Sequence, residues 1–217
     1  MAAALEIDVY VDLICPWCLI GKRYLDKAVS DLRHDAPDTQ VDVRWHSVQL
    51  LPNAPAQGWD FKAFYLQRLG SAEAMRQRQA QVNAAAARAG FQIDFAGMVR
   101  MPNTLQAHQL LAFASTRLSA VRFAELLERL FAAHFQRGED LCARATLLAI
   151  AGSMGLDAAA LAQWLDAGHG QPVGLDVPGV PFFVFNQQLA LSGAQPPDVL
   201  LDAMRQASAQ ATAGSVL

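Results

Sequence analysis

Two cysteines three positions apart are the residues of this chain best suited to carry chemistry. Cys15 and Cys18 enclose Pro16 and Trp17, and a proline at this point fits the first position of a helix. The first cysteine then lies at the end of a strand, and the second lies one turn into the helix, facing the same way. Free backbone N–H groups and the positive end of the helix dipole favour an anion at Cys15. We therefore expect Cys15 to be the nucleophile and the more covered Cys18 to resolve a mixed disulfide.

Metal binding and inert packing are the two other interpretations of this pair. A closed zinc site needs four ligands, and beyond the pair the chain has only Cys142 and five scattered histidines. Inert core thiols are disfavoured because Pro16 at a helix start predicts an exposed sulfur at the helix N-terminus. We therefore expect a redox pair and no metal.

Three residues outside the cysteine pair have weaker claims to a role. Trp17 is expected to shape the motif and the substrate surface, because an indole only donates a hydrogen bond. Asp12 lies three residues before Cys15 and either tunes that thiol, whose pKa a carboxylate would raise, or is a surface charge at the strand end, which is the preferred interpretation. Cys142 is either a redox partner or, as preferred, a small buried hydrophobe.

The composition predicts a folded globular protein. The 217 residues, 53% of them hydrophobic and 17% charged, can bury a large core in one or two domains. A net charge of -3 without runs of Lys or Arg argues against nucleic-acid and membrane-surface partners. No apolar stretch reaches the roughly 20 residues that span a bilayer, and the N-terminus lacks the pattern of a signal peptide. With three cysteines, too few for a secreted disulfide framework, we expect a soluble, cytoplasmic protein.

The elements around the motif predict a strand-helix-strand unit. Residues 5–13 alternate between apolar and polar side chains, and from Trp17 the apolar residues recur at three- and four-residue steps. Alternation returns at residues 41–46, so that a helix joins two strands that are expected to be parallel, with a right-handed crossover. The motif then lies at the first strand-to-helix turn.

A helical block and a second group of strands follow. Helices are predicted near residues 60–69, 72–89, 104–118, 120–137, 143–154 and 157–167, with Ser71 and Asn103 as caps. Residues 182–185 predict a buried strand and residues 189–191 an antiparallel partner. A final helix is expected to open at the Pro196-Pro197 pair, and residues 208–217 are expected to form a frayed tail.

Four stretches resemble one known family. In chain order they are Asp12–Lys22, Asn103–His108, Gly179–Phe183 and Ser192–Pro196. In this order they are similar to the DsbA-like thioredoxin-fold proteins, specifically the FrnE-type branch described as polyketide-biosynthesis dithiol-disulfide isomerases. The resemblance implies an α/β, thioredoxin-like fold with a large helical domain inserted into it. The thioredoxin-like domain would comprise residues 1–59 and 169–217, and the inserted domain residues 60–168.

The resemblance also implies the residues that support the active site. Val180-Pro181 would be the cis-proline loop, which packs beside the disulfide and offers backbone groups to an extended substrate, together with Pro16 and Trp17 of the motif. From the residues alone, a trans proline that starts a strand is favoured.

The same resemblance implies a substrate groove that includes His108, Asn103 and Gln195. A histidine on a mostly apolar helix is otherwise a packed or solvent-facing residue. The stretch 164–177 is shorter than in the family, and Asp176 stands where glycine is frequent, so a truncated helix is expected before Pro181.

The main functional hypothesis is a thiol-disulfide oxidoreductase or disulfide isomerase acting on protein or small-molecule thiols and disulfides. It needs no cofactor beyond the Cys15–Cys18 pair, with glutathione as a conceivable co-substrate, and it fits a monomer or a homodimer. One alternative is a glutathione-dependent isomerase or transferase of the related thioredoxin-fold group, whose members typically have serine in place of Cys15. The other is a non-enzymatic, chaperone-like binding module that uses an apolar groove of the helical block.

Overall fold

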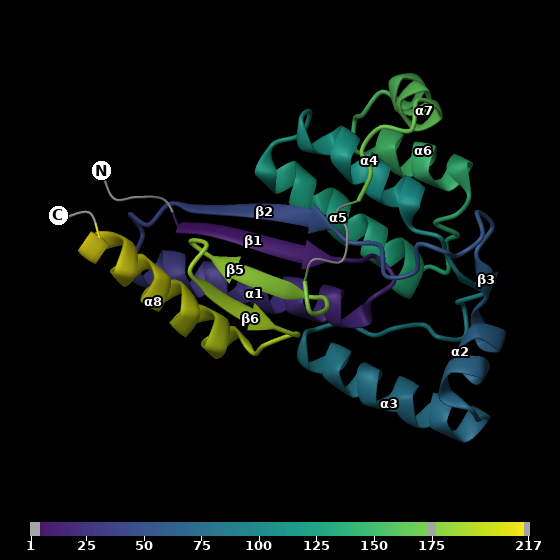
Figure 1. The fold of residues 1–217 in the computed structure, drawn as a ribbon, viewed down its shortest axis with the longest axis horizontal. Coiled ribbons are helices and arrows are strands. Elements are labelled where there is room, and N and C mark those ends of the chain that lie inside the picture. Colours follow the sequence, from purple (N-terminus) through teal and green to yellow (C-terminus); the bar gives the residue numbers. More distant parts are fainter. Residues whose placement is uncertain (1–4, 173–176, 215–217) are drawn as a thin grey trace. The chain divides into compact units, whose positions relative to one another are not determined.

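A computed structural model of the chain describes residues 5–172 and 177–214 (Figure 1). Strands and helices alternate near both ends of the sequence, and helices predominate in its middle. The elements are, in order, β1 (Leu5–Val11), α1 (Pro16–Asp35), β2 (Val41–Ser47), β3 (Trp59–Asp60), α2 (Phe61–Leu69), α3 (Ala72–Arg88), β4 (Arg100–Met101), α4 (Leu105–Ser115), α5 (Ala120–Phe135), α6 (Arg144–Ser153), α7 (Ala158–Asp166), β5 (Phe182–Phe185), β6 (Leu189–Ser192) and α8 (Pro197–Gly214). The α/β class predicted from the sequence is confirmed.

The described residues divide into two compact units. The first contains residues 5–48 and 177–214, and the second contains residues 49–172. The second unit is therefore inserted, along the sequence, between β2 and β5. The helical domain predicted at 60–168 lies wholly within it.

The first unit is built on a four-stranded sheet with the strand order β2-β1-β5-β6. β1 and β2 are parallel, with Leu5 opposite Val41, whereas β5 is antiparallel to both β1 and β6. The predicted strand-helix-strand unit and the predicted C-terminal hairpin are thus confirmed. A helical crossover is required because parallel neighbours cannot be joined by a tight turn.

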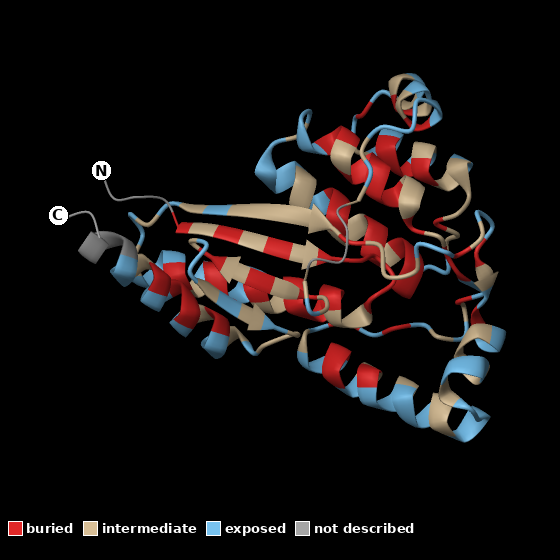
Figure 2. Cartoon of the chain, in the orientation of Figure 1, coloured by how far each residue is buried: buried red, intermediate tan, exposed pale blue. Residues whose placement is uncertain are grey.

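One face of this sheet is the core of the first unit. Along β1 every second residue, starting at Leu5, is buried, and the residues between are half-buried (Figure 2). This period of two follows from the alternation of side chains across a strand. α1 and α8 pack against each other, and α8 also contacts β1 and β5. The packing fixes the N-terminus of α1 just beyond the end of β1.

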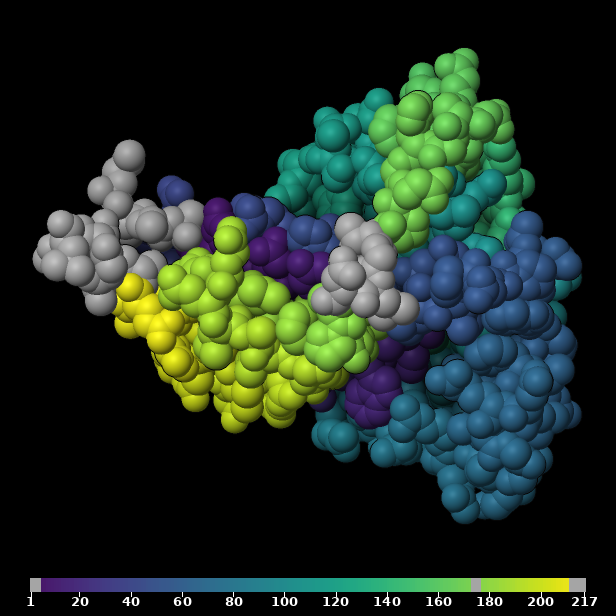
Figure 3. Space-filling view, viewed as in Figure 1, coloured from purple at the N-terminus to yellow at the C-terminus, as the bar shows by residue number. Residues whose placement is uncertain are grey.

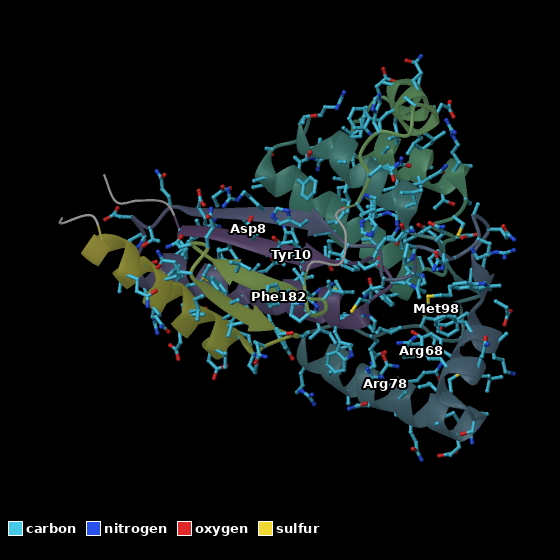
Figure 4. The ribbon with its side chains drawn as sticks, viewed as in Figure 1. Asp8, Tyr10, Arg68, Arg78, Met98 and Phe182 are labelled. Atoms are coloured by element: carbon cyan, nitrogen blue, oxygen red, sulfur yellow. The ribbon has the colours of Figure 1, made fainter. Side chains whose placement is uncertain are left out.

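The other face of the sheet carries ion pairs and stacked rings. Asp8 accepts hydrogen bonds from Arg44 at 3.3 Å and pairs with His46 at 2.7 Å. His46 stacks on Tyr10 with ring centroids 4.6 Å apart, and Phe182 lies beside Tyr10 at 6.1 Å. Figure 4 labels Asp8, Tyr10 and Phe182, which come from two adjacent strands. Asp8 is therefore held by side chains of β2.

The second unit consists of α2 to α7 and a short two-stranded sheet. The six helices confirm those predicted, with ends shifted by a few residues. Ser71 caps α3 as expected, since its hydroxyl accepts the N–H of Ala74 at 3.1 Å. The pairing of β3 with β4, in which Trp59 lies opposite Met101, was not predicted, because strands of two residues carry no periodic signal. Over the described ranges, no helix is long and apolar enough to cross a membrane.

The C-terminal helix is longer than the sequence predicts. α8 begins at Pro197 as expected but continues to Gly214, so the prediction of a frayed tail from residue 208 is wrong over 208–214. Ala207 is buried, and the hydroxyl of Ser208 donates to the carbonyl of Met204 at 2.9 Å. The helix thus continues because residues such as Ala207 pack on one face, although the small residues of this stretch show no periodic apolar pattern. Residues 215–217 lie outside the described part.

The β5–β6 hairpin turns through two residues with positive φ, Asn186 at 47° and Gln187 at 58°. The side chain of Asn186 accepts the N–H of Glu6 at 2.9 Å and donates to the carbonyl of Ala207 at 3.0 Å. The turn is therefore tied to β1 and α8, and the hairpin and α8 form one continuous surface of the first unit (Figure 3).

The stretch before β5 contains little helix. α7 ends at Asp166, and residues 167–172 form no helix. Residues 173–176, among them Asp176, lie outside the described residues, so the expectations for them stay predictions.

Candidate active site

Cys15 occupies the N-cap of α1. Its backbone is extended, with φ -92° and ψ 109°, and Pro16 begins the helix. Its N–H donates to the carbonyl of Asp12 at 3.1 Å, while its own carbonyl accepts the N–H of Cys18 at 3.0 Å. A sulfur at this position lies at the positive end of a helix of 20 residues, where anions are stabilised. Only 8% of Cys15 is exposed, so the exposed sulfur that Pro16 predicts is wrong: the loop before β5 lies against the thiol.

Cys18 lies in the first turn of α1 and is fully buried. Burial raises the pKa of its thiol well above the usual range, and the neighbouring Cys15 and the carboxylate of Asp12 raise it further. A hydrogen bond from the backbone of Asp12 acts in the opposite direction. Both thiols are free. The pair is therefore asymmetric, with one sulfur at the helix terminus and the other kept protonated by its surroundings.

The loop before β5 meets the first cysteine. The Val180-Pro181 peptide bond is cis, as the family resemblance implies and contrary to what the residues alone favour. The thiol of Cys15 lies 3.6 Å from the carbonyl oxygen of Val180. The carbonyl of Pro181 in turn accepts the N–H of Gly193 at 2.8 Å. The end of β6 therefore holds the loop that faces Cys15.

Gly21 sets the distance between α1 and this loop. A Cβ at Gly21 would lie 3.0 Å from Cγ of Pro181 and 3.1 Å from Cζ of Phe183. Contacts this short are rarer than ordinary van der Waals contacts, which begin near 3.5 Å between carbons. Only glycine allows α1 to approach the loop this closely.

Two charged side chains near the motif are buried in the first unit. Asp12, directly after β1, is 0% exposed, and Lys22, one turn beyond Cys18, is 4% exposed. Nζ of Lys22 lies 2.8 Å from Oδ2 of Asp26. The interpretation of Asp12 as a surface charge is therefore wrong. The turn that follows β1 carries it inward, and the strand pattern gives no sign of this.

Asn103 joins three segments of the second unit. Its side-chain oxygen accepts the N–H of Leu105 at 3.0 Å and the amide of Gln49 at 2.8 Å, and its amide donates to the carbonyl of Ala54 at 2.6 Å. The predicted cap of α4 is confirmed through the bond to Leu105. Its predicted place in a substrate groove stays a prediction.

Cys142 lies beside Asn103 in the same unit. Its sulfur accepts the N–H of Asn103 at 3.2 Å. Burial raises the pKa of the Cys142 thiol, against the effect of this hydrogen bond. Cys142 is half-buried and not buried, so the preferred interpretation as a buried hydrophobe is wrong in that respect. A thiol that resists ionisation is a poor nucleophile, which argues against the redox role.

The other two predicted groove residues lie in different units. His108 is 0% exposed on α4 of the second unit, so it is a packed residue and not a solvent-facing one. Gln195, in the first unit, bonds within its own turn, where its backbone N–H donates to the carbonyl of Gly193 at 2.9 Å and its side chain donates to that of Ser192 at 2.7 Å. A substrate contact of either residue stays a prediction.

Metal ligands do not gather around the cysteine pair. Within residues 5–172 and 177–214, no three side chains of His, Cys, Asp or Glu come together in a way that could hold a metal ion. The arrangement of Cys15, Cys18 and the Val180 carbonyl is instead suited to thiol-disulfide exchange, in which a thiolate attacks a sulfur and a second thiol displaces it.

Comparisons with known proteins agree with this geometry. A model of the DSBA-like thioredoxin domain matches residues 6–205. An uncharacterised protein of Bacillus subtilis, YwbO, is 24% identical over 204 residues, which are 89% of this chain and 92% of YwbO.

Solved structures of the same fold include two named as oxidoreductases or reductases. The probable DsbA oxidoreductase SCO1869 from Streptomyces coelicolor has a TM-score of 0.81 and 25% identity, with 94% of this chain and 89% of that chain covered. The cytosolic disulfide reductase DsbM from Pseudomonas aeruginosa, solved with GSH, has a TM-score of 0.57 and 18% identity, with 93% and 98% covered. The fold is thus thioredoxin-like, and this chain belongs to the DSBA-like thioredoxin domain family.

Proposed function

We propose that this chain is a thiol-disulfide oxidoreductase or isomerase in which Cys15 attacks and Cys18 resolves. The observation that carries the proposal is the asymmetry of the pair. Cys15 caps α1 next to the Val180 carbonyl, whereas Cys18 is buried and its pKa is raised. A helix N-terminus stabilises the thiolate that must attack, and a protonated second thiol does not compete with it.

The reaction exchanges two electrons and balances without a cofactor. The Cys15 thiolate attacks one sulfur of a substrate disulfide, a Cys15–substrate disulfide forms, and the first substrate thiolate leaves. Cys18 then attacks the sulfur of Cys15, the mixed disulfide breaks, and the second substrate thiolate leaves. The substrate disulfide is reduced to two thiols, and the Cys15–Cys18 pair is oxidised to a disulfide. The reverse sequence oxidises a substrate dithiol.

Cysteine variants test the assignment of roles. We expect Cys15→Ser to abolish turnover of a disulfide substrate, and Cys18→Ser to accumulate a mixed disulfide at Cys15 that mass spectrometry detects. Cys142→Ser is the matched control and should retain turnover, because burial raises the pKa of the Cys142 thiol and makes it a poor nucleophile. Turnover by Cys15→Ser would refute the mechanism. If the double variant Cys15→Ser, Cys18→Ser still protected client proteins, the result would instead favour the chaperone-like binding module.

The direction of electron flow is decided by the reduction potential. The protein is equilibrated in glutathione buffers, free thiols are alkylated, and the oxidised fraction is measured by mass. A reduction potential of about -120 mV is expected of a disulfide donor, and one of about -270 mV is expected of a reductant. The absence of a reversible Cys15–Cys18 disulfide would overturn the proposed function.

We also propose glutathione as a co-substrate and the cytoplasm as the compartment. Both rest on the fold shared with DsbM, which is named as cytosolic and was solved with GSH. Protein and small-molecule thiols are the proposed partners. If glutathione reduced the oxidised protein far more slowly than a dithiol does, that result would argue against glutathione as the co-substrate. Cell fractionation tests the compartment.

A further inference from the structure

β2 lies at one edge of the four-stranded sheet of the first unit, where its one strand neighbour among the described residues is β1 (Figure 1). A strand at a sheet edge presents a row of N–H and C=O groups with which another strand can pair. Proteins commonly protect such edges by short strands, prolines or lysines. β6, at the opposite edge, has four residues, whereas β2 has seven and contains neither proline nor lysine. β2 is therefore the edge better suited to pair with another chain.

The backbone groups of β2 that point away from β1 follow from the two ends of the β1–β2 ladder. The N–H of Leu5 donates to the carbonyl of Gln40 at 2.8 Å, and the N–H of Val48 donates to the carbonyl of Val11 at 2.9 Å. Successive residues of a paired strand direct their backbone groups to opposite sides, so the even-numbered residues of β2 face β1. The odd-numbered residues direct their N–H and C=O groups to the outer edge, and these residues are Val41, Val43, Trp45 and Ser47.

On the face of the sheet that packs against α1 and α8, β2 leaves apolar surface uncovered. Three apolar side chains of β2 are only half-buried, whereas the residues opposite them on β1 are buried; the three are Val41, Val43 and Trp45. A further strand beside β2 would cover this surface, and removal of apolar surface from water is favourable.

On the opposite face, β2 carries an exposed carboxylate next to a guanidinium. Asp42 is exposed, and Arg44 pairs with Glu6 at 2.6 Å and with Asp8 at 3.2 Å. Among the described residues these bonds of Arg44 use its Nη2 and Nε atoms. Nη1 is thus left to bind a carboxylate from outside the sheet. The edge therefore offers both signs of charge, two positions apart on one face.

We propose that two copies of this chain associate through β2, as antiparallel strands related by a twofold axis at Val43. In this register Val43 lies opposite Val43 of the second copy, and Val41 lies opposite Trp45, so the outward backbone groups exchange hydrogen bonds. Asp42 of each copy lies opposite Arg44 of the other. These two form a non-hydrogen-bonded pair, in which opposite side chains come closest.

Charge selects this register over its immediate neighbours. An axis at Asp42 would place that carboxylate opposite itself, and an axis at Arg44 would do the same to the guanidinium. Like charges directly opposite each other destabilise a strand pair, whereas opposite charges stabilise it. The axis at Val43 forms the Asp42–Arg44 pair twice, because a twofold interface repeats each contact.

This association does not depend on the proposed reaction, and it leaves each cysteine pair to work alone. Cys15 follows the C-terminal end of β1, which is parallel to β2. Because the two β2 strands are antiparallel, the two copies of Cys15 lie toward opposite ends of the joined sheet. Cys18 of one copy therefore does not resolve a disulfide at Cys15 of the other, and dissociation should leave turnover per chain unchanged.

A disulfide placed at the twofold axis tests the register. In a full-length background with serine at all three native cysteines, Val43→Cys introduces two thiols whose Cα atoms are about 5.5 Å apart in a hydrogen-bonded pair, a distance that a disulfide spans. In the matched control Val41→Cys, the two thiols lie about 14 Å apart along the strands. We expect diamide to convert most of Val43→Cys, and little of Val41→Cys, into a covalent dimer. Equal yields, or none from Val43→Cys, would overturn the register.

Sedimentation equilibrium of the unsubstituted, reduced protein measures the association itself. The average mass should rise with concentration from 23.5 kDa toward twice that value. Asp42→Lys should raise the dissociation constant by about tenfold or more, because two opposite-charge pairs become like-charge pairs. Asp202→Lys is the control, because it makes the same change of charge at an exposed position of α8, and it should leave the dissociation constant unchanged.

The outcomes separate this proposal from the proposed function. A mass of 23.5 kDa at every concentration would overturn the second copy as the occupant of this edge and would point to an extended segment of another protein. Equal dissociation constants for Asp42→Lys and Asp202→Lys would place the contact elsewhere and also overturn it. Turnover of a disulfide substrate is measured on the same samples. A dimer without turnover would refute the proposed function alone, and an always monomeric protein with turnover would refute the association alone.

Discussion

The contact between α1 and the Val180–Pro181 loop can be tested at Gly21. In Gly21→Ala the new methyl group would lie 3.0 Å from Cγ of Pro181 and 3.1 Å from Cζ of Phe183. Phe183 is fully buried, and Pro181 is bound through its carbonyl to Gly193. Neither ring is the flexible end of a long side chain, so the methyl group must displace a packed element.

Two opposing effects determine the size of the change. Replacing glycine by alanine inside a helix stabilises it by about 1 kcal/mol, whereas adding a methylene-sized group to a packed core costs about 1–3 kcal/mol. We expect the second effect to prevail, so that Gly21→Ala lowers the free energy of unfolding by about 1 kcal/mol.

Gly152 provides a matched control in α6. A Cβ there would meet nothing within 4 Å, so Gly152→Ala retains only the favourable helix term and should stabilise its unit by about 0.5–1 kcal/mol. The assay is urea denaturation followed by far-UV circular dichroism. Amide hydrogen exchange of α1 and α6 then reports the two units separately.

The reasoning would be refuted if Gly21→Ala stabilised the first unit as much as Gly152→Ala stabilises the second. That result would mean that Pro181 and Phe183 move aside without cost and that glycine is not required at this contact.

Three further predictions concern pH, Asn103 and the hairpin turn. Because folding raises the pKa of Cys18, the unfolded chain loses this proton first as the pH rises above about 8.5. The stability of the reduced protein should then fall by up to about 1.4 kcal/mol per pH unit, while the oxidised protein, which lacks the thiol, should not show this loss in parallel urea titrations. Asn103→Ala removes three side-chain hydrogen bonds, to Gln49, Ala54 and Leu105, and should lower the stability of the second unit by about 2–4 kcal/mol, measured by amide exchange of α4; a change below about 0.5 kcal/mol would contradict this. Gln187→Gly relieves a positive φ of 58° and should raise the free energy of unfolding by about 1 kcal/mol, seen as a higher thermal midpoint. An unchanged or lower midpoint would show that the turn is not strained.

The sequence predicts the local structure of the chain well, for a physical reason. Periodicity, caps and turn residues act between neighbours, and so the strands at the ends, the helices between them and the cap at Ser71 were foreseeable. The position of Cys15 and Cys18 at a strand-to-helix turn follows from the same signals and from Pro16. The placement of both thiols at the start of one helix could therefore be predicted before any packing was known.

For some residues the local sequence pattern does not predict the environment that the structure shows. Asp12 follows an alternating strand, and a charge there suggests a surface position, yet it is buried. Gly21 and Lys22 stand in a helix whose pattern predicts no role for either. The groups that Gly21 meets, Pro181 and Phe183, lie far along the chain.

By itself the sequence determined the order of elements and the placement of two thiols at one strand-to-helix turn, because residue type and spacing act locally. Tertiary structure alone decided which group faces Cys15. The Val180 carbonyl that lies 3.6 Å from its sulfur is 165 residues away, and the cis bond that follows it is disfavoured in an isolated chain. Burial of Asp12 and the approach of α1 to the loop at Gly21 have the same origin. Each depends on the packing of distant segments, which local patterns do not encode.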